Sequence, residues 1–173
     1  DPDVEGYGVQ CHRLTYWTPE GRSVRRRQYT PDLVLRMRNG KHVVVEVKAS
    51  GLAGKAAWRE VEDHIQRAYR DDHDADFIVL TEQEIRQEPY LSNARVMLAH
   101  RGRPAPEVEL PLLEALESEC GPTSIRSLSD ILGQIGIAYD QVFTTVMQCA
   151  LEGKVELDMS RAFSATTQVW IGE

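Results

Sequence analysis

The stretch 33–48 constrains the fold most, because it reads as two Val- and Leu-rich strands joined by a tight turn at Asn39-Gly40. A two-residue turn would pair Leu33 with Glu46 and mix apolar with charged side chains on both faces. A three-residue loop, with the glycine in the left-handed region, pairs Asp32 with Glu46 instead. We predict this second register, since a slip of one residue moves every side chain to the other face.

The predicted register separates an apolar face from a polar one. We expect the apolar face to be buried; it comprises Leu33, Leu35, Met37, Val43, Val45 and Val47. The other face brings Asp32, Glu46 and Lys48 together, because cross-strand partners and residues two apart on a strand are neighbours. Two close carboxylates repel each other unless a cation lies between them, and Mg2+ (or Mn2+) binds such oxygens. The carbonyl of Val47 can add a ligand, and the lysine can stabilise charge on a phosphate.

This polar cluster has a simpler interpretation. An acid-x-Lys pair on a strand is common, and Glu46 and Lys48 can form a salt bridge on a solvated strand face. Spacing alone leaves both interpretations open.

The surrounding segments predict a mixed sheet. Residues 9–17 and 22–29 read as strands around a turn at 18–21, residues 55–70 as a helix, and residues 76–81 as a short buried strand. A three-strand meander, a helix and a further strand indicate an α+β or mixed α/β fold.

The motif residues resemble a known nuclease family. Tyr29-Thr30-Pro31-Asp32 followed by Glu46-Val47-Lys48 is similar to the PD-(D/E)xK nuclease superfamily. With Gln10, the run Leu80-Thr81-Glu82, Ile85-Arg86 and Asn93, the pattern resembles the TnsA-type endonuclease subunit of heteromeric transposases. This resemblance implies an α/β restriction-endonuclease-like core, a mixed sheet with flanking helices.

The resemblance also implies an activity. A metal-dependent DNA endonuclease would hydrolyse one strand at the transposon end while a separate transposase cleaves the other. Asp32 and Glu46 would be metal ligands and Lys48 the catalytic lysine. Such nucleases usually carry another acidic residue on a helix before the first strand, and we expect this chain, which opens on Asp1, to lack that helix. Glu5, in a segment that reads as loop, is a weak replacement.

Basic residues lie close to the motif. Arg25, Arg26 and Arg27 crowd one strand and Lys55 begins the following helix, so all four can neutralise phosphates of double-stranded DNA. The alternative is a strand edge whose charges prevent aggregation. We see no aromatic residues interleaved with these arginines, which gives single-strand binding little support.

The second part of the chain differs in charge. Residues 1–103 hold 17 Lys+Arg and 16 Asp+Glu, whereas residues 104–173 hold 3 and 11. We place the domain boundary there, because Gly102, Pro104 and Pro106 interrupt regular structure. Predicted helices at 110–119, 127–134 and 138–152, followed by strands at 155–158 and 168–171, indicate a small winged-helix-like domain. Pro111 would lie in the first turn of its helix, and Ser127 would cap the second helix.

The charge of residues 104–173 argues against phosphate contact and favours binding to a protein. The resemblance implies docking on an ATP-dependent regulator and on the transposase. The alternative is a packing domain that only stabilises the core.

Composition excludes several other classes. No apolar run approaches a membrane span, and three scattered cysteines fit reduced thiols in a cytoplasmic protein rather than a disulfide scaffold or zinc finger.

Three hypotheses therefore compete: the transposase endonuclease subunit, another PD-(D/E)xK nuclease such as a restriction or junction-cleaving enzyme, and a non-catalytic nuclease-fold scaffold that binds transposition partners.

Overall fold

The computed structural model describes residues 3–172 and divides the chain into two units between Arg86 and Gln87. This division lies upstream of the boundary predicted after residue 103. None of the helices in the described residues is both long enough and apolar enough to cross a membrane.

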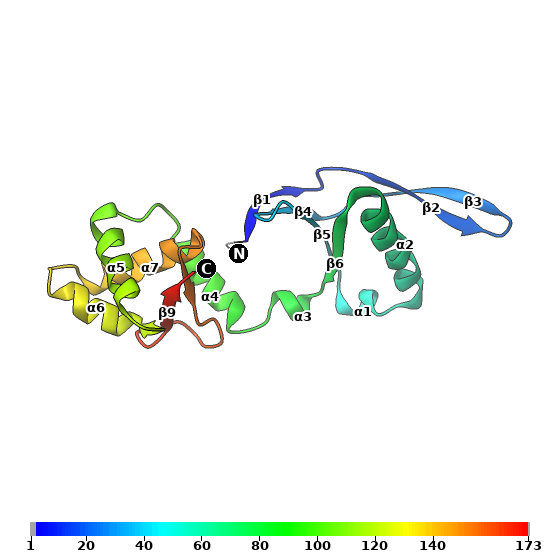
Figure 1. The fold of residues 1–173 in the computed structure, drawn as a ribbon. Coiled ribbons are helices and arrows are strands. Elements are labelled where there is room, and N and C mark those ends of the chain that lie inside the picture. The colour runs from blue at the N-terminus through cyan, green and yellow to red at the C-terminus, as the bar shows by residue number, and fades with distance from the viewer. Residues whose placement is uncertain (1–2, 173) are drawn as a thin grey trace. The chain divides into compact units, whose positions relative to one another are not determined.

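The N-terminal unit, Asp3–Arg86, is a mixed α/β structure (Figure 1). Its elements are β1 (Val4–Val9), β2 (Leu14–Glu20), β3 (Ser23–Tyr29), β4 (Leu33–Met37), β5 (His42–Val47), α1 (Ser50–Ala53), α2 (Ala56–His73), β6 (Ala75–Leu80) and α3 (Glu82–Ile85). The main sheet has the order β1-β4-β5-β6. Its first three strands pair antiparallel, and β6 pairs parallel to β5, which α2 makes possible by returning the chain across the sheet.

The structure confirms the predicted register of the central hairpin. Leu33 pairs with Val45 and Arg36 with His42, so the pairing continues in step toward Asp32 and Glu46. The amide of Met37 donates to the carbonyl of Lys41 at 2.9 Å, and Gly40 has a φ of 83°. That left-handed conformation favours glycine because it has no Cβ to clash with the backbone.

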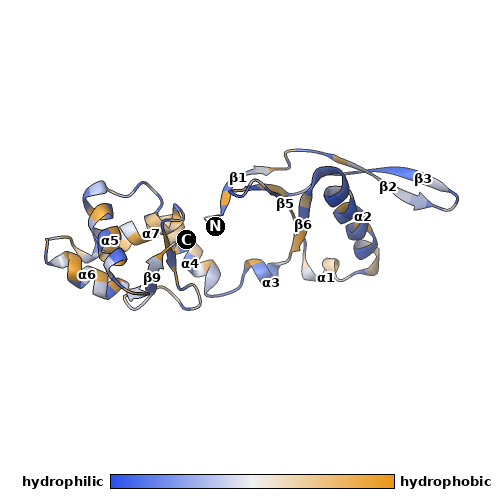
Figure 2. Ribbon diagram, in the orientation of Figure 1, coloured by the Kyte–Doolittle hydropathy of each residue, from blue (hydrophilic) through white to orange (hydrophobic). Residues whose placement is uncertain are grey.

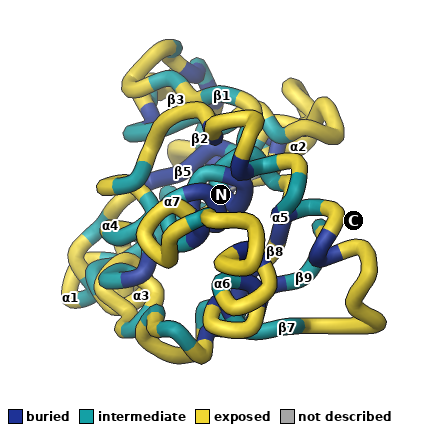
Figure 3. Tube along the Cα trace, turned by 90° about the vertical axis from the view of Figure 1, so that its left-hand side faces the viewer, coloured by how far each residue is buried: buried dark blue, intermediate teal, exposed yellow. Residues whose placement is uncertain are grey.

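The expectation about which face is buried is wrong. Helix α2 packs on the face that carries Val44 and Phe77, with Ile65 and Tyr69 at its contact with the sheet. The face predicted to be buried is more open, since Val47 is 44% exposed, although Val45 is buried. Figure 3 shows β5 among the buried strands of this unit. Alternation determines the two faces of a strand, whereas the path of the helix decides which one it covers.

The predicted three-strand meander does not form. β3 pairs only with β2 in a separate two-stranded sheet, which we call the ribbon, and β1 occupies the place beside β4. The segment around Glu5, predicted to be a loop, is therefore a strand. Glu5 forms an ion pair with Arg36 at 3.0 Å, so its carboxylate is engaged on the edge strand of the sheet.

The C-terminal unit begins at Gln87 and combines helices with a small sheet. Its elements are α4 (Tyr90–Ala99), α5 (Pro106–Ser118), β7 (Thr123–Ser124), α6 (Ile125–Gly133), α7 (Tyr139–Leu151), β8 (Val155–Leu157) and β9 (Gln168–Ile171). The three strands are antiparallel in the order β7-β9-β8. Figure 2 shows apolar residues on the helices of this unit, and their buried side chains form one core.

Helix α4 explains why the boundary differs from the prediction. Val96 and Met97 pack against the core of the C-terminal unit, and Asn93 is 1% exposed there. The Gly- and Pro-rich stretch 101–106 is thus a loop within one unit rather than a linker between two.

Two finer expectations about the C-terminal helices are also wrong. Because α5 begins at Pro106, Pro111 lies inside the helix instead of in its first turn. Ser124 caps α6, and its hydroxyl accepts a hydrogen bond from the amide of Ser127 at 3.0 Å.

Candidate functional site

The acidic cluster forms where β4 begins and β5 ends. The amide N–H of Val47 donates to Oδ2 of Asp32 at 2.8 Å, which holds that carboxylate beside the end of β5. The main-chain amide of Lys48 donates to the carbonyl of Leu80 at 2.9 Å, so the pairing with β6 continues one residue past Val47, the last residue of β5. The structure therefore brings Asp32, Val47 and Lys48 to one place through backbone pairing, next to Glu46 on the helix-covered face.

Glu46 is the most deeply buried member of the cluster. It is 8% exposed, and its two carboxylate oxygens have different partners. Oε1 contacts Nζ of Lys48 at 2.7 Å, and Oε2 accepts a hydrogen bond from the hydroxyl of Tyr29 at 2.5 Å. A buried carboxylate requires such partners, because leaving a charge unsatisfied away from water costs several kcal/mol, on the order of the effective penalty per buried ion.

Lys48 is held by a second contact. Its Nζ lies 3.7 Å from the centroid of the Trp58 ring, which comes from the first turn of α2. An ammonium group over an indole face is stabilised by the ring quadrupole, and this effect is larger where water is excluded. The side chain of Lys48 is 19% exposed. The helix thus fixes the position of the lysine while one side of the cluster stays open to solvent.

The electrostatics of the cluster are visible at Tyr29. Burial raises the pKa of this phenol, and the hydrogen bond to Glu46 and the negative charge of Glu46 raise it further; the charge of Asp32 adds a smaller contribution. Tyr29 therefore stays protonated and remains a hydrogen-bond donor to the carboxylate. The same effects show that both acidic groups act on one small region.

The solvated salt-bridge alternative fits this geometry poorly. The predicted Glu46–Lys48 ion pair is present, but its side chains are 10% and 19% exposed, so it is not on a solvated strand face. Replacing such a buried pair by apolar residues is often neutral or stabilising. A strand that retains it beside a second acidic residue is a candidate functional site on physical grounds.

The cluster offers hard oxygen ligands but few of them. Within residues 3–172, no group of three or more His, Cys, Asp or Glu side chains is placed to hold a metal ion. Asp32 and Glu46 supply two carboxylates, and Val47, whose carbonyl we predict as a further ligand, is held beside Asp32 by its own amide. Magnesium commonly binds one or two protein carboxylates together with substrate phosphate oxygens and water. The residues fit that open kind of site.

The segments that follow β5 and β6 are tied together beside the cluster. The amide and hydroxyl of Ser50 donate to the carboxylate of Glu82 at 2.9 and 2.6 Å. These hydrogen bonds hold the pKa of Glu82 below its usual range. Glu82 thus acts as an anchor between α1 and α3, which orders the chain around the end of the sheet.

Two other residues of the sequence pattern have identifiable roles. The amide of Gln10, the residue after β1, donates to the carbonyl of Asp32 at 3.0 Å and so supports the main chain at the acidic residue. Asn93 belongs to the C-terminal unit, where its side chain bonds the main chain at Met159, Arg161 and Phe163. It supports the loop between β8 and β9.

The predicted DNA-binding residues are all exposed. Arg25, Arg26 and Arg27 lie on β3, and Lys55 lies at the start of α2, three residues before Trp58. Successive residues of a strand point to opposite faces, so Arg26 lies on one side of the ribbon and the other two arginines on the opposite side.

Sequence reasoning missed two residues of the cluster, Tyr29 and Trp58. Tyr29 opens the motif but has no acidic neighbour in the sequence, and its contact with Glu46 depends on the path from β3 into β4. Trp58 is partly buried against the core under α2, and one face of its ring contacts the lysine. A lysine that ends a strand, followed closely by a helix bearing an aromatic residue in its first turn, is the signal that could have indicated this contact.

Comparison with known proteins identifies no family. No family model matches the chain. No curated protein matches it either.

Proposed function

We propose that this protein is a magnesium-dependent DNA endonuclease, and that it is the subunit of a cut-and-paste transposase that hydrolyses a phosphodiester at the transposon end. One observation carries the proposal: a half-buried Asp32, a buried Glu46 and Lys48 are held together at the open end of a mixed sheet. The order of strands and helices in the N-terminal unit is compatible with a restriction-endonuclease-like core.

Each residue has a part that its contacts support. When bound, a divalent cation would supply Lewis-acid stabilisation of the phosphate and a more acidic water. Asp32 and Glu46 would hold it, with the Val47 amide orienting Asp32 and the Tyr29 hydroxyl orienting Glu46. Lys48, kept in place by the Trp58 ring, carries the positive charge that stabilises negative charge developing on the phosphate.

The C-terminal unit supports the partner side of the proposal. Its helices and its three-stranded sheet follow the order of a winged helix, but α7 is largely buried, with Val142, Thr145, Val146 and Cys149 inside the core. Residues 87–172 carry 6 Lys+Arg and 11 Asp+Glu, which disfavours contact with phosphates. We propose that this unit docks on the transposase and on an ATP-dependent regulator. Retention of those two partners in a pull-down would separate this function from that of a restriction or junction-cleaving nuclease.

A non-catalytic scaffold is the second candidate, and one observation favours it. Both oxygens of Glu46 already have protein partners, Lys48 and Tyr29, so the carboxylate is satisfied without a cation.

Nicking of supercoiled plasmid separates the two candidates. We expect the wild-type chain to nick DNA only with Mg2+ or Mn2+. Asp32→Asn and Lys48→Met should each lower the nicking rate by about 100-fold or more, as removal of other charge-stabilising groups does. Asp76→Asn is the matched control, because Asp76 is an exposed acidic residue opposite Val43, which lies on the other face of the sheet from Glu46. Metal-independent nicking, or equal rates in all variants, would contradict the proposed function.

A further inference from the structure

The ribbon formed by β2 and β3 is the most strongly cationic part of the N-terminal unit. Residues 14–29 contain four arginines and one acidic residue, a net charge of +3, while the whole of residues 3–86 holds 14 Lys+Arg and 14 Asp+Glu. The rest of the unit is therefore net negative, and its positive charge is concentrated on the ribbon. Figure 1 shows the ribbon extending beyond the main sheet, and Figure 2 shows its hydrophilic character along β3.

The base and the tip of the ribbon differ in burial. At the base, Leu14 is 2% and Tyr16 is 7% exposed, and both belong to the core under α2. Toward the tip, Trp17 and Val24 are 60% and 68% exposed. The base fixes the ribbon to the unit, and the tip is free to meet another molecule.

One face of the tip combines an aromatic residue with a cation. Trp17 pairs directly with Arg26, and Pro19 pairs with Val24 on the same face. We call these four residues the outer face. No aromatic residue is interleaved with the arginines in the sequence, but the pairing of β2 with β3 makes Trp17 the cross-strand neighbour of the middle arginine.

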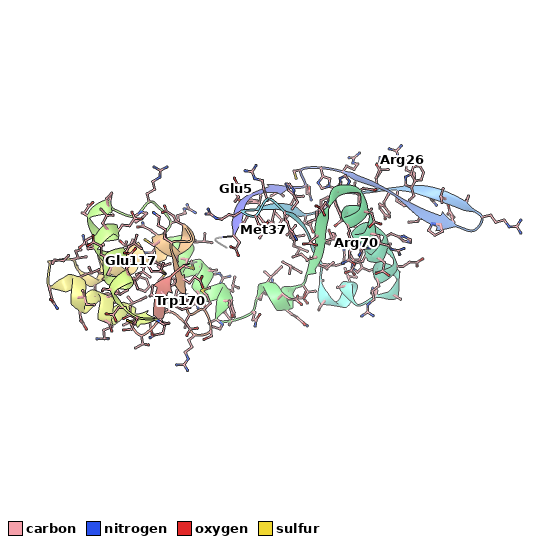
Figure 4. All side chains as sticks on the ribbon, viewed as in Figure 1. Glu5, Arg26, Met37, Arg70, Glu117 and Trp170 are labelled. Carbon is pink, nitrogen blue, oxygen red and sulfur yellow. The ribbon has the colours of Figure 1, made fainter. Side chains whose placement is uncertain are left out.

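The three consecutive arginines also differ in their partners. Arg25 forms an ion pair with Glu20 at 3.1 Å, and Nε of Arg27 donates to the hydroxyl of Thr18 at 3.5 Å. Arg26 makes no hydrogen bond or ion pair with any of the described residues. Figure 4 shows its side chain pointing away from the ribbon. Its five donors are available for a ligand.

We propose that the ribbon is a groove-binding arm for duplex DNA and that its outer face, led by Arg26 and Trp17, contacts the base edges. This inference rests on the proposed nuclease function, since it supplies the binding mode of the substrate. The major groove of B-DNA accommodates a two-stranded ribbon, a free guanidinium can bond O6 and N7 of guanine, and an apolar side chain can contact a thymine methyl. Charge complementarity with phosphates directs the ribbon to DNA rather than to an apolar partner.

The test measures binding without cleavage. Fluorescence anisotropy of a labelled 20-base-pair duplex, titrated with the full chain in EDTA, gives affinity at several salt concentrations. We expect Arg26→Ala and Trp17→Ala each to weaken binding roughly tenfold, in line with loss of one base contact. Arg26→Lys, which keeps the charge but loses the planar fork, should also weaken binding.

Matched controls separate the ribbon from general effects. Arg70→Ala removes an exposed arginine from the last turn of α2, and Tyr7→Ala removes an aromatic residue that is 73% exposed on β1. Both should stay within about twofold of wild type, as expected for exposed side chains outside the contact surface. Far-UV circular dichroism checks that every variant is folded.

Several results would overturn the inference. These are wild-type affinity in both Arg26→Ala and Trp17→Ala, tighter binding of the corresponding single strand than of the duplex, or no duplex binding by wild type at low salt. The binding assay contains no divalent cation, so it is independent of cleavage. If the wild-type chain nicks DNA but the two substitutions leave its affinity unchanged, only the groove-binding arm is rejected. If the wild-type chain does not nick DNA but both substitutions weaken binding, only the nuclease function is rejected.

Discussion

Replacing Tyr29 with phenylalanine removes one hydroxyl group from the acidic cluster and leaves the ring in place. The hydroxyl donates to Oε2 of Glu46 at 2.5 Å, and Glu46 is 8% exposed. Water cannot fully replace the lost donor at such depth. A hydrogen bond to a charged group contributes about 1.5–3 kcal/mol, so we expect the free energy of unfolding of the N-terminal unit to fall by about 2 kcal/mol.

Urea titration followed by the NMR signals of Val44 and Ile65 measures this change, because both residues lie in the core of the N-terminal unit. Tyr16→Phe is the matched control: Tyr16 is 7% exposed in the same core and its hydroxyl bonds no other described residue. We expect the control to change stability by less than about 0.5 kcal/mol. Equal effects of the two substitutions would refute the claim that Tyr29 satisfies a buried carboxylate.

The same variant has a predicted alkaline signature. The pKa of Tyr29 is raised in the folded protein, so above its ordinary value of about 10 the unfolded chain loses a proton that the folded chain keeps. Fewer protons on the unfolded state mean that stability falls as pH rises, by about 1.4 kcal/mol per pH unit for one group. Between pH 10 and 11 we expect the stability of Tyr29→Phe to fall by about 1 kcal/mol less than that of the wild type, because the unfolded phenol is only half ionised at pH 10. An unchanged slope would show that Tyr29 ionises normally.

Two further substitutions test other parts of the fold. Asn93→Ala should destabilise the C-terminal unit by about 2 kcal/mol, because three main-chain groups lose a buried partner. Hydrogen exchange at the Phe163 amide should accelerate, and unchanged exchange would contradict the claim that Asn93 supports the loop between β8 and β9. Gly40→Ala should lower the free energy of unfolding by about 1–2 kcal/mol, measured by heat or urea, because the φ of Gly40 is 83°. Gly51→Ala in α1 should leave stability unchanged or raise it. Equal stability of the two variants would argue against the left-handed loop.

The hairpin register could be predicted from sequence because its determinants are local. Alternating Val and Leu residues on both strands and one glycine in the turn allow only one arrangement that keeps the faces apart, and the observed Leu33–Val45 pair is the expected one. The proximity of Asp32 to the end of β5 followed from that register.

The rest of the cluster could not be predicted because it depends on contacts distant in sequence. Which face α2 covers is set by how the helix crosses to β6, so a pattern within the hairpin does not reveal that Glu46 is buried. The Tyr29–Glu46 bond and the Trp17–Arg26 pair join residues on different elements. The observed division differs from the predicted boundary for a similar reason, since the contacts of Asn93, Val96 and Met97 with the C-terminal core are distant in sequence.

Manganese binding tests the central claim most directly. Mn2+ broadens NMR signals of nearby nuclei, so titration into the isotope-labelled full chain should selectively broaden the amides of Val47 and Lys48. Asp32→Asn should abolish this broadening, and Asp76→Asn, which removes a carboxylate from the opposite face of the sheet, should leave it intact. If the two amides stay sharp in the wild-type chain, or broaden equally in Asp32→Asn, the cluster does not hold a divalent cation.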